Sequence, residues 1–222
     1  MVAGDEAVLR RSPPAPDLLR LHEAVATLFA TQGDWRRAYQ HLRSALDIAR
    51  DGSLRDALTS SYNRRYLDER LYRPFADRQP GPLGLALVDL DRFKRVNDTY
   101  GHLVGDRVLR RVADLLQEEL PPEGFCARYG GEEFVLWLPG VDAGHAVRIV
   151  DAARVRVARH PWSELQPGLR VTISAGLAHE GPAEPERQLR SADDLLYAAK
   201  RAGRNKVAYH DAQTTRLITH SE

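Results

Sequence analysis

The chain has very little cysteine: Cys126 is the only one among its 222 residues. A single cysteine cannot form a disulfide within the chain, which fits a reducing compartment. Cys126 stands in a run typical of a strand, so we expect a buried apolar thiol rather than a nucleophile. An excess of either charge is also lacking, since the formal net charge is +1. No bulk attraction to nucleic acid or to a membrane is therefore expected.

Long hydrophobic runs are absent as well. No uninterrupted apolar run approaches the length needed to span a membrane, and the N-terminus lacks the pattern of a signal peptide. The composition, 43% hydrophobic and 28% charged, is that of a soluble protein with enough apolar residues for a core. The length suits one domain of ordinary size with an additional segment. We expect a soluble, cytoplasmic protein.

The first part of the chain predicts a short helical segment. Residues 1–16 hold several prolines among mixed charges and predict a flexible leader. Residues 17–52 show two helical patterns separated at Gly33-Asp34, the second running from Trp35 to about Arg50. Each pattern has an apolar face that we expect to be buried: Leu18, Leu21, Val25, Leu28 and Phe29, then Trp35, Ala38, Leu42, Ala45 and Leu46.

This helical pair resembles one tetratricopeptide unit, and a plain helical hairpin is the alternative. A single unit is not stable alone, because stacked repeats bury their apolar faces against one another. We therefore expect the pair to pack on the following domain, on a partner subunit or on further repeats.

A turn with two glycines organises the rest of the chain. Gly130-Gly131 lies between two strand-like runs and predicts a tight hairpin turn, because glycine enters the positive-φ region without steric cost. The turn would lift Glu132 and Glu133 to a sheet edge, where backbone and carboxylates can approach a phosphorylated ligand. An ordinary surface hairpin is the alternative for these residues taken alone.

A second acidic stretch lies upstream of this turn. Residues 83–90 predict a strand buried on both faces, and the strand carries Asp89 near its end. A carboxylate there is costly unless it is paired, hydrogen-bonded or bound to a cation. Asp91 and many polar side chains follow at once. Mg²⁺ favours one or two carboxylates together with substrate phosphates, whereas the plainer interpretation is that Asp89 caps the next turn.

The order of predicted elements indicates an α+β fold. After a helix near residue 64 come a strand, a helix from about Asp106, the hairpin of residues 125–138 and a helix of residues 143–159. A strand over 171–178, a helix over 192–202 and a short strand over 206–209 follow. This order predicts helices packed on a mainly antiparallel sheet. We place this domain at residues 53–211 and expect a frayed tail over 212–222.

Five motifs resemble those of the GGDEF family, the diguanylate cyclases. The signature Gly130-Gly131-Glu132-Glu133-Phe134 is similar to the GGEEF form. The others are Asp56-x-Leu58-Thr59 with Asn63-Arg64-Arg65, the stretch from Asp89 to Asp106, Ser174-Ala175-Gly176, and Ala192-Asp193 with residues 197–205. They stand in the family's order and near-normal spacing over residues 53–210.

The resemblance implies a palm-like domain of the nucleotidyl cyclase type, related to ferredoxin-like folds. It implies that two GTP molecules are condensed into cyclic di-GMP with release of pyrophosphate. It also implies Mg²⁺, with Mn²⁺ as a possible substitute, and a homodimer of catalytic domains. By the same resemblance Asp89, Glu132 and the Leu90 carbonyl hold the metal, and Glu132, Glu133 and Lys94 are catalytic. The residues implied to bind substrate are Asn97 and Asp106 at the guanine, Lys94, Lys200 and Arg204 at the phosphates, and the backbone at Phe93, Gly130 and Gly131.

Two departures from the family pattern bear on regulation and affinity. The inhibitory Arg-x-x-Asp motif is replaced by Pro121-Pro122-Glu123-Gly124, which predicts no product inhibition through that site. Ser60-Ser61 stands where the family usually has Gly-Leu, which affects the nucleotide pocket but removes no catalytic group.

Two functions of other classes remain as alternatives. The domain could bind GTP without turnover and act as a receptor that signals through the N-terminal helices. The chain could also serve chiefly as an interaction module, with the helical pair bound to a protein partner. Retention of both predicted metal ligands and of the phosphate-side cations favours the enzyme.

Overall fold

The computed structural model describes residues 15–72, 81–118, 120–180, 185–211 and 214–218. The chain divides into two compact units, Met1–Arg55 and Asp56–Glu222. Most of the predicted leader, residues 1–14, lies outside the described part of the chain. None of the helices in the described part is both long and apolar enough to cross a membrane.

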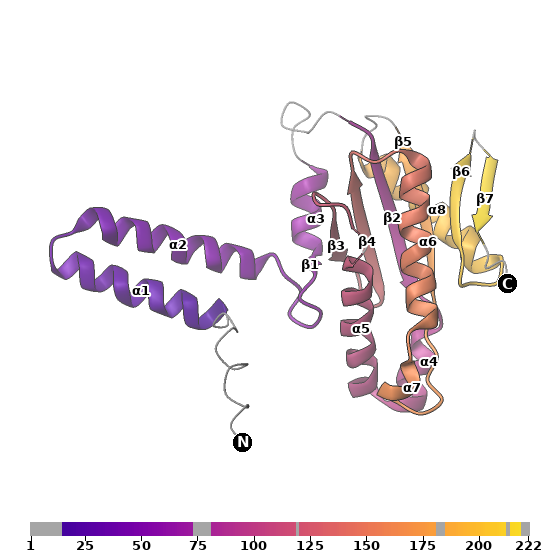
Figure 1. The fold of residues 1–222 in the computed structure, drawn as a ribbon, viewed down its shortest axis with the longest axis horizontal. Coiled ribbons are helices and arrows are strands. Elements are labelled where there is room, and N and C mark those ends of the chain that lie inside the picture. The colour runs from indigo at the N-terminus through magenta and orange to yellow at the C-terminus, as the bar shows by residue number, and fades with distance from the viewer. Residues whose placement is uncertain (1–14, 73–80, 119, 181–184, 212–213, 219–222) are drawn as a thin grey trace, which may run out of the picture. The chain divides into compact units, whose positions relative to one another are not determined.

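The first unit is a helical hairpin of α1 (Ala15–Thr31) and α2 (Trp35–Ser53), seen in Figure 1. The connection turns at Gly33, whose φ of 79° suits glycine. Asp34 then caps α2, because its carboxylate accepts a hydrogen bond from the Arg37 backbone N–H at 3.2 Å. The seam between the helices is filled by buried alanines, namely Ala26, Ala38 and Ala45.

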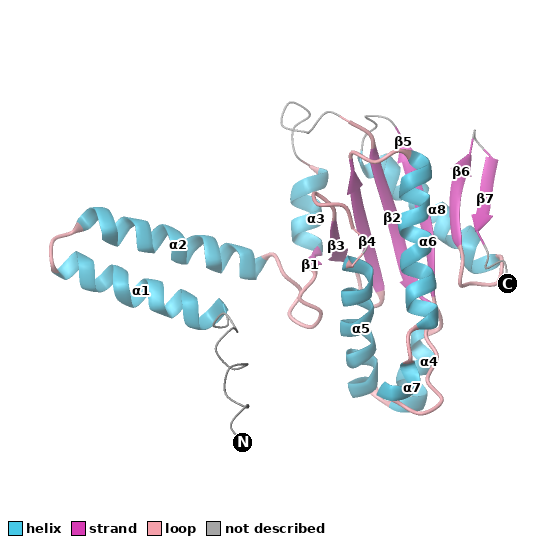
Figure 2. Ribbon diagram, in the orientation of Figure 1, coloured by secondary structure: helices cyan, strands magenta, loops and turns pink. Residues whose placement is uncertain are grey.

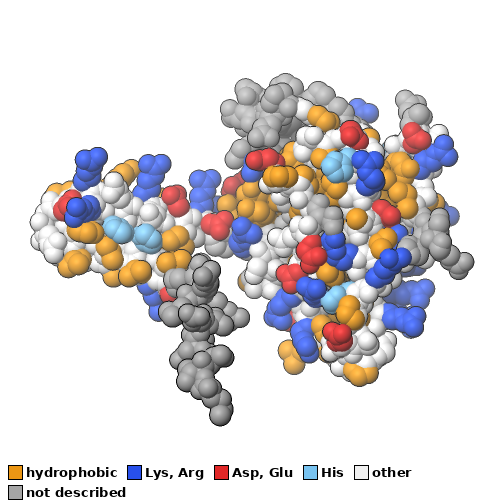
Figure 3. Space-filling view, viewed as in Figure 1, with side chains coloured by type: hydrophobic (Ala, Val, Ile, Leu, Met, Phe, Trp, Pro, Cys, Tyr) orange, Lys and Arg blue, Asp and Glu red, His pale blue; other side chains and the backbone are white. Residues whose placement is uncertain are grey.

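The prediction that α2 buries its large apolar side chains is wrong. Trp35, Leu42 and Leu46 are 71%, 54% and 68% exposed, and Leu21 and Leu28 of α1 are also more than half exposed. Two helices alone share one narrow seam, which small alanines fill, so larger side chains beside it stay at the surface. Hydrophobic side chains are accordingly visible on the surface of the hairpin in Figure 3.

The second unit is built on one sheet in the order β1-β3-β4-β2-β5-β6-β7. Its central strand β2 pairs antiparallel with β4 and with β5, whereas β1–β3 and β5–β6 are parallel pairs. The mainly antiparallel sheet confirms the predicted α+β class. The strands are β1 (Tyr62–Asn63), β2 (Leu83–Leu90), β3 (Phe125–Arg128), β4 (Glu133–Pro139), β5 (Ile173–Glu180), β6 (Val207–Asp211) and β7 (Thr214–Ile218).

Helices cover both faces of this sheet. Successive side chains of β2 point to opposite faces, so Ala86 and Val88 pack with α4, α5 and α6, while Leu85 and Leu87 pack with α3 and α8. Figures 1 and 2 show α5 and α6 in front of the sheet. The helices are α3 (Arg64–Leu71), α4 (Phe93–Tyr100), α5 (His102–Gln117), α6 (Ala143–Arg159), α7 (Trp162–Leu165) and α8 (Pro185–Arg201).

Several details differ from the predicted elements. Residues 93–100, expected only as a polar segment after β2, form the helix α4, and α8 begins well before the predicted Ala192. Strand β7 pairs antiparallel with β6, so the expectation of a frayed tail is wrong for residues 214–218. Cys126 is buried, as expected, and its burial raises the pKa of the thiol.

Candidate active site

Asp89 and Glu132 meet at one end of the sheet. Asp89 lies near the end of β2, opposite Glu133 of β4 on one side and Ser174 of β5 on the other. The next residue, Leu90, donates its backbone N–H to the Glu132 carbonyl at 3.2 Å. The carboxylates that the sequence placed in two separate motifs therefore lie on adjacent strand ends.

An arginine holds the signature turn in place. The Arg128 guanidinium donates to the carbonyls of Gly130 at 3.2 Å and Gly131 at 2.7 Å, and to the Asp56 carboxylate at 3.0 Å. Asp56 also accepts from the backbone N–H and the hydroxyl of Thr59. Burial pulls the pKa of Asp56 upward, but the hydrogen bonds from Thr59 and Arg128 prevail and lower it. Asp56 of the opening motif thus helps to hold the signature turn in place through its contact with Arg128.

The predicted reason for the two glycines is wrong. Neither Gly130 nor Gly131 has a positive φ, and the strands are joined by residues 129–132 rather than by a two-residue turn. Tyr129 and Gly130 both donate their backbone N–H to the Glu133 carbonyl. A Cβ on Gly130 would lie 3.0 Å from the Glu133 carboxylate. Glycine is favoured there because it leaves room for the Glu133 side chain.

The two carboxylates are held where their charge is unfavourable. Burial raises the pKa of Asp89, and the ion pair with Lys200 offsets part of that shift. Burial also raises the pKa of Glu132, and the nearby charge of Asp89 raises it further. A cation relieves both effects, since it favours the ionised form of a carboxylate.

The donor set fits a hard divalent cation. Two carboxylates and the adjacent Leu90 carbonyl are the oxygen ligands that Mg²⁺ and Mn²⁺ prefer, with nucleotide phosphates completing the shell. No cluster of three or more acidic, histidine or cysteine side chains suited to a metal occurs among the described residues. Lys200 Nζ lies 2.8 Å from Asp89 Oδ2 and now supplies the positive charge.

The predicted guanine-binding residues lie where α4 meets α5. The Asn97 backbone carbonyl accepts a hydrogen bond from the Gly101 backbone N–H at 2.9 Å, and the Asn97 side chain lies directly against Gly105. A Cβ at Gly105 would collide with the Asn97 amide oxygen. Asp106, next to Gly105, is half-buried, whereas Phe93 at the start of α4 is buried. The turn between the helices therefore brings Asn97 close to the backbone that carries Asp106.

The predicted phosphate-side cations differ in their present contacts. Lys200 is bound to Asp89, as described above. Lys94 and Arg204 are exposed and make no ion pair within the described ranges of the chain. Arg204 follows the end of α8 and has a φ of 67°, so its backbone is held in the left-handed region.

Asp91 is a positioning residue that the sequence reasoning did not assign. Its carboxylate accepts hydrogen bonds from the hydroxyls of Thr172 and Ser174, both at 2.7 Å, and from the Asn205 backbone N–H at 2.9 Å. Asn205 also has a positive φ, 48°. Asp91 therefore anchors the turn that carries Arg204, and its spacing two residues after Asp89 was the available signal.

A buried arginine holds the same turn from the other side. Arg154 of α6 is 1% exposed and donates to Asp151 at 2.7 Å and to the Asn205 side-chain oxygen at 3.0 Å. A buried charge is tolerated when it is paired and hydrogen-bonded. Nothing in the local sequence distinguishes Arg154 from a surface arginine of an amphipathic helix.

The serines that depart from the family pattern also have structural roles. Ser60 has a φ of 59°, in the region where glycine is usual. Ser61 is fully buried, and its hydroxyl lies 2.8 Å from that of Thr59. The substitution of Ser61 for an apolar residue is thus accommodated by a hydrogen bond within the opening motif.

Comparison with known proteins agrees with this geometry. Residues 53–206 match the family described as "Diguanylate cyclase, GGDEF domain". The diguanylate cyclase DgcP of Pseudomonas aeruginosa is 41% identical over 167 residues, which cover 74% of this chain and 25% of that protein. The response regulator PleD of Caulobacter vibrioides is 38% identical over 184 residues, which cover 80% of this chain and 40% of PleD. The chain thus spans well under half the length of these relatives.

Solved structures show the same likeness. The coiled coil and GGDEF domain of DgcB from Caulobacter crescentus, in complex with c-di-GMP, matches with a TM-score of 0.71 and 33% identity, over 83% of this chain and all of that one. The diguanylate cyclase SiaD of Pseudomonas aeruginosa, in complex with its activator SiaC, matches with a TM-score of 0.69 and 34% identity, over 86% of this chain and 75% of that one. The fold is therefore the palm-like fold of these domains, and the chain belongs to the GGDEF family of diguanylate cyclases.

Proposed function

We propose that this chain condenses two molecules of GTP into cyclic di-GMP. In each half of the reaction the 3′-hydroxyl of one GTP attacks the α-phosphate of the other, a phosphoester bond forms, and pyrophosphate leaves. The observation that carries the proposal is the meeting of Asp89 and Glu132 at adjacent strand ends. A buried carboxylate and a half-buried one, both with raised pKa values, are suited to a metal-dependent phosphoryl transfer.

The carboxylates and the Leu90 carbonyl would hold Mg²⁺ or Mn²⁺. When bound, such an ion neutralises phosphate charge and stabilises the transition state of phosphoryl transfer. Glu132 would in addition help to remove the proton from the attacking 3′-hydroxyl, for which its raised pKa is suited. Glu133, adjacent in the signature, would assist at the same place.

The remaining residues would bind and orient the nucleotide. Asn97 and Asp106 would read the guanine edge, with Asp106 as an acceptor for the N1 and N2 donors. The phosphates would be held by Lys94, Lys200 and Arg204, by the backbone at Phe93, and by close approach of the backbone at Gly130 and Gly131. Positioning and charge stabilisation of this kind account for most of the catalysis in phosphoryl transfer.

One domain has one such nucleotide site, so the reaction requires two domains that face each other. We propose a homodimer of the catalytic domain, with the exposed apolar face of the hairpin as a contact that controls pairing. A second copy of the chain or another protein would occupy that face. The structural relative SiaD is known in complex with its activator SiaC, which supports control by a protein partner.

The chain would lack product inhibition through the family's primary inhibitory site. Pro121-Pro122-Glu123-Gly124 offers neither the arginine nor the aspartate of that motif. Cyclic di-GMP added to the assay would therefore leave the initial rate unchanged at concentrations that saturate the inhibitory site of relatives with the motif.

Product analysis after incubation with GTP and Mg²⁺ tests the proposal. Wild-type protein is expected to form cyclic di-GMP, and Glu132→Gln, which keeps the shape but removes the charge, is expected to form none. Glu123→Gln is the matched control, because Glu123 is exposed and lies outside the site. Absence of product from wild type at high protein concentration, with GTP still bound, would contradict the cyclase and favour a GTP-binding receptor.

A further inference from the structure

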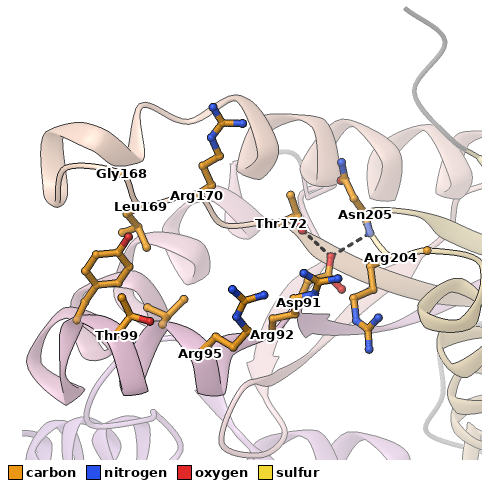
Figure 4. Close-up of a pocket in the computed structure, with 13 residues that line it drawn as sticks. Asp91, Arg92, Arg95, Thr99, Gly168, Leu169, Arg170, Thr172, Arg204 and Asn205 are labelled. Carbon is orange, nitrogen blue, oxygen red and sulfur yellow. Dashed lines mark hydrogen bonds between the residues drawn. The ribbon is translucent and has the colours of Figure 1, made fainter.

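A pocket of about 520 Å³ lies beside α4 (Figure 4), and neither of the predicted guanine-binding residues lines it. It is bounded by α4, by the segment before β5 and by the turn after α8. Asp89, Glu132, Asn97 and Asp106 do not line it; of the residues predicted to bind GTP or metal, only Arg204 lines it, together with Asp91, Thr172 and Asn205, which hold the Arg204 turn. Its volume is in the range of pockets that hold small organic ligands, about 300–1,000 Å³.

The pocket is strongly positive. Four arginines from three separate segments line it, namely Arg92, Arg95, Arg170 and Arg204. In the part of the chain that the structure describes, none of the four has an ion-pair partner. Since arginine matches phosphate oxygens with paired donors, the ligand chemistry indicated is a compound with several phosphates.

Among the described residues that line the pocket, Asp91 alone carries a carboxylate. This carboxylate accepts three hydrogen bonds from Thr172, Ser174 and Asn205 and is not ion-paired with any of the four arginines. Asp91 therefore fixes the floor of the pocket and the turn that carries Arg204, while the guanidinium groups remain open to an anion.

The two ends of the pocket differ in character. Figure 4 shows Arg204 and Asn205 at one end, and Thr99, Gly168 and Leu169 at the other. Tyr100 lies at the second end, because its hydroxyl would be 3.6 Å from a Cβ on Gly168. This end is therefore aromatic and aliphatic, with Val96 and Leu169 beside Tyr100. A nucleobase is a flat group that such a surface holds by stacking.

The side chains beside the base do not select one base, because the Thr99 and Tyr100 hydroxyls at that end can each donate or accept a hydrogen bond. The Asn205 side-chain oxygen accepts from the buried Arg154, and the Thr172 hydroxyl donates to Asp91. A base at the Tyr100 end would be held by its face rather than read at its edges. The pocket would consequently accept adenine as well as guanine, unlike the site formed by Asn97 and Asp106.

We propose that this pocket is a second nucleotide site, which binds a nucleoside polyphosphate with its phosphates on the arginines and its base against Tyr100 and Leu169. Because Arg204 serves both sites, a nucleotide in this pocket would draw Arg204 away from the GTP phosphates. Its regulatory consequence, inhibition of turnover by ATP, rests on the function proposed above, whereas the binding itself does not.

Direct binding of a fluorescent ATP analogue to the full chain tests the proposal. Adenine avoids the guanine-reading residues, so the signal reports the second site. Arg95→Ala combined with Arg170→Ala is expected to weaken binding at least ~10-fold, because charge-assisted hydrogen bonds to phosphate are lost. Arg190→Ala, an exposed arginine of α8 outside the pocket, is the matched control and should bind like wild type. Asp106→Ala should also leave this binding unchanged.

Three results would overturn the proposal. They are no binding of the ATP analogue at millimolar concentration, equal binding by the double variant and wild type, and loss of binding in Asp106→Ala. Tripolyphosphate that binds as tightly as ATP would overturn the placement of a base at the Tyr100 end. A chain that binds ATP through Arg95 and Arg170 but forms no cyclic di-GMP would support the second site and contradict only the cyclase.

Discussion

Lys200 Nζ lies 2.8 Å from Asp89 Oδ2 and joins the last turn of α8 to the end of the central strand β2. Family resemblance assigns these residues to different ligands, the lysine to phosphate and the aspartate to metal. In the free protein each neutralises the other. Binding of nucleotide with its metal would replace this ion pair with one ligand contact for each residue.

Lys200→Gln should lower both stability and turnover. The change leaves the Asp89 carboxylate, only 8% exposed, without its charged partner. Breaking a fully buried pair costs about 3–5 kcal/mol, and because the Lys200 side chain is 31% exposed we expect about 1–2 kcal/mol. Urea denaturation measures the loss, and GTP turnover should fall by about 10²-fold. Lys206→Gln is the control, and equal losses in the two variants would contradict this role.

Gly105→Ala should weaken GTP binding while the fold is kept. The new methyl group would collide with the Asn97 amide, a side chain that can move aside at small cost. Alanine also favours helix over glycine by about 1 kcal/mol, which protects α5. We expect a GTP affinity roughly 10-fold lower by calorimetry, because a hydrogen bond to the base is lost.

Gly144→Ala in α6 is the control for this variant, since a Cβ there meets neighbours only at 3.4 Å and beyond. Unchanged GTP affinity in Gly105→Ala would show that Asn97 does not contribute to nucleotide binding.

Gly176→Ala in β5 should destabilise the domain more than Gly84→Ala in β2. A Cβ on Gly176 would run into the α8 backbone at Ala192 and Leu196, which cannot move without shifting the helix. Overpacking typically costs about 1–3 kcal/mol, and we expect the upper part of that range. Gly84→Ala, whose Cβ would meet only side chains at 3.2 Å and beyond, should cost less in the same denaturation experiment.

Asp56 should make the stability of the domain depend on acid. Its hydrogen bonds with Thr59 and Arg128 lower its pKa below the usual value of 3.8. The stabilisation is therefore complete above pH 3.8 and is lost as the pH falls through the lower pKa of the folded state. Asp56→Asn should be less stable than wild type at pH 6, and the difference should shrink below pH 3.8. A difference that stays constant down to pH 2.5 would be inconsistent with a depressed pKa.

Leu42→Ser combined with Leu46→Ser should alter assembly rather than folding. Both side chains are more than half exposed, so their removal leaves the alanine seam of the hairpin intact. We expect the same helix content by circular dichroism, a larger monomer fraction in sedimentation and lower turnover per chain. Arg36→Ser with Gln40→Ser, also exposed on α2, is the control. An unchanged monomer fraction together with unchanged turnover would exclude a role of this face in pairing.

Much of the fold could be predicted because its signals are local. The unbroken apolar run of β2 predicted a strand buried on both faces, and the strand occupies the predicted residues Leu83–Leu90. The helix α6 also has its predicted bounds, Ala143–Arg159. In contrast, α4 was missed because its polar residues outnumber its apolar ones, and only Phe93 and Val96 are buried.

The sequence by itself determined the family, the sheet-and-helix class and the two acidic positions. Each follows from the local order of residues and from the spacing of apolar residues, every two in a strand and about every four in a helix. Neither signal requires knowledge of distant contacts. Tertiary structure alone decided that Lys200 neutralises Asp89, that Asp91 and Arg154 hold the turn of Arg204, and which apolar side chains of the hairpin stay exposed. These features join residues up to 114 positions apart. Burial and charge pairing between such residues arise only when the sheet brings its strand ends together.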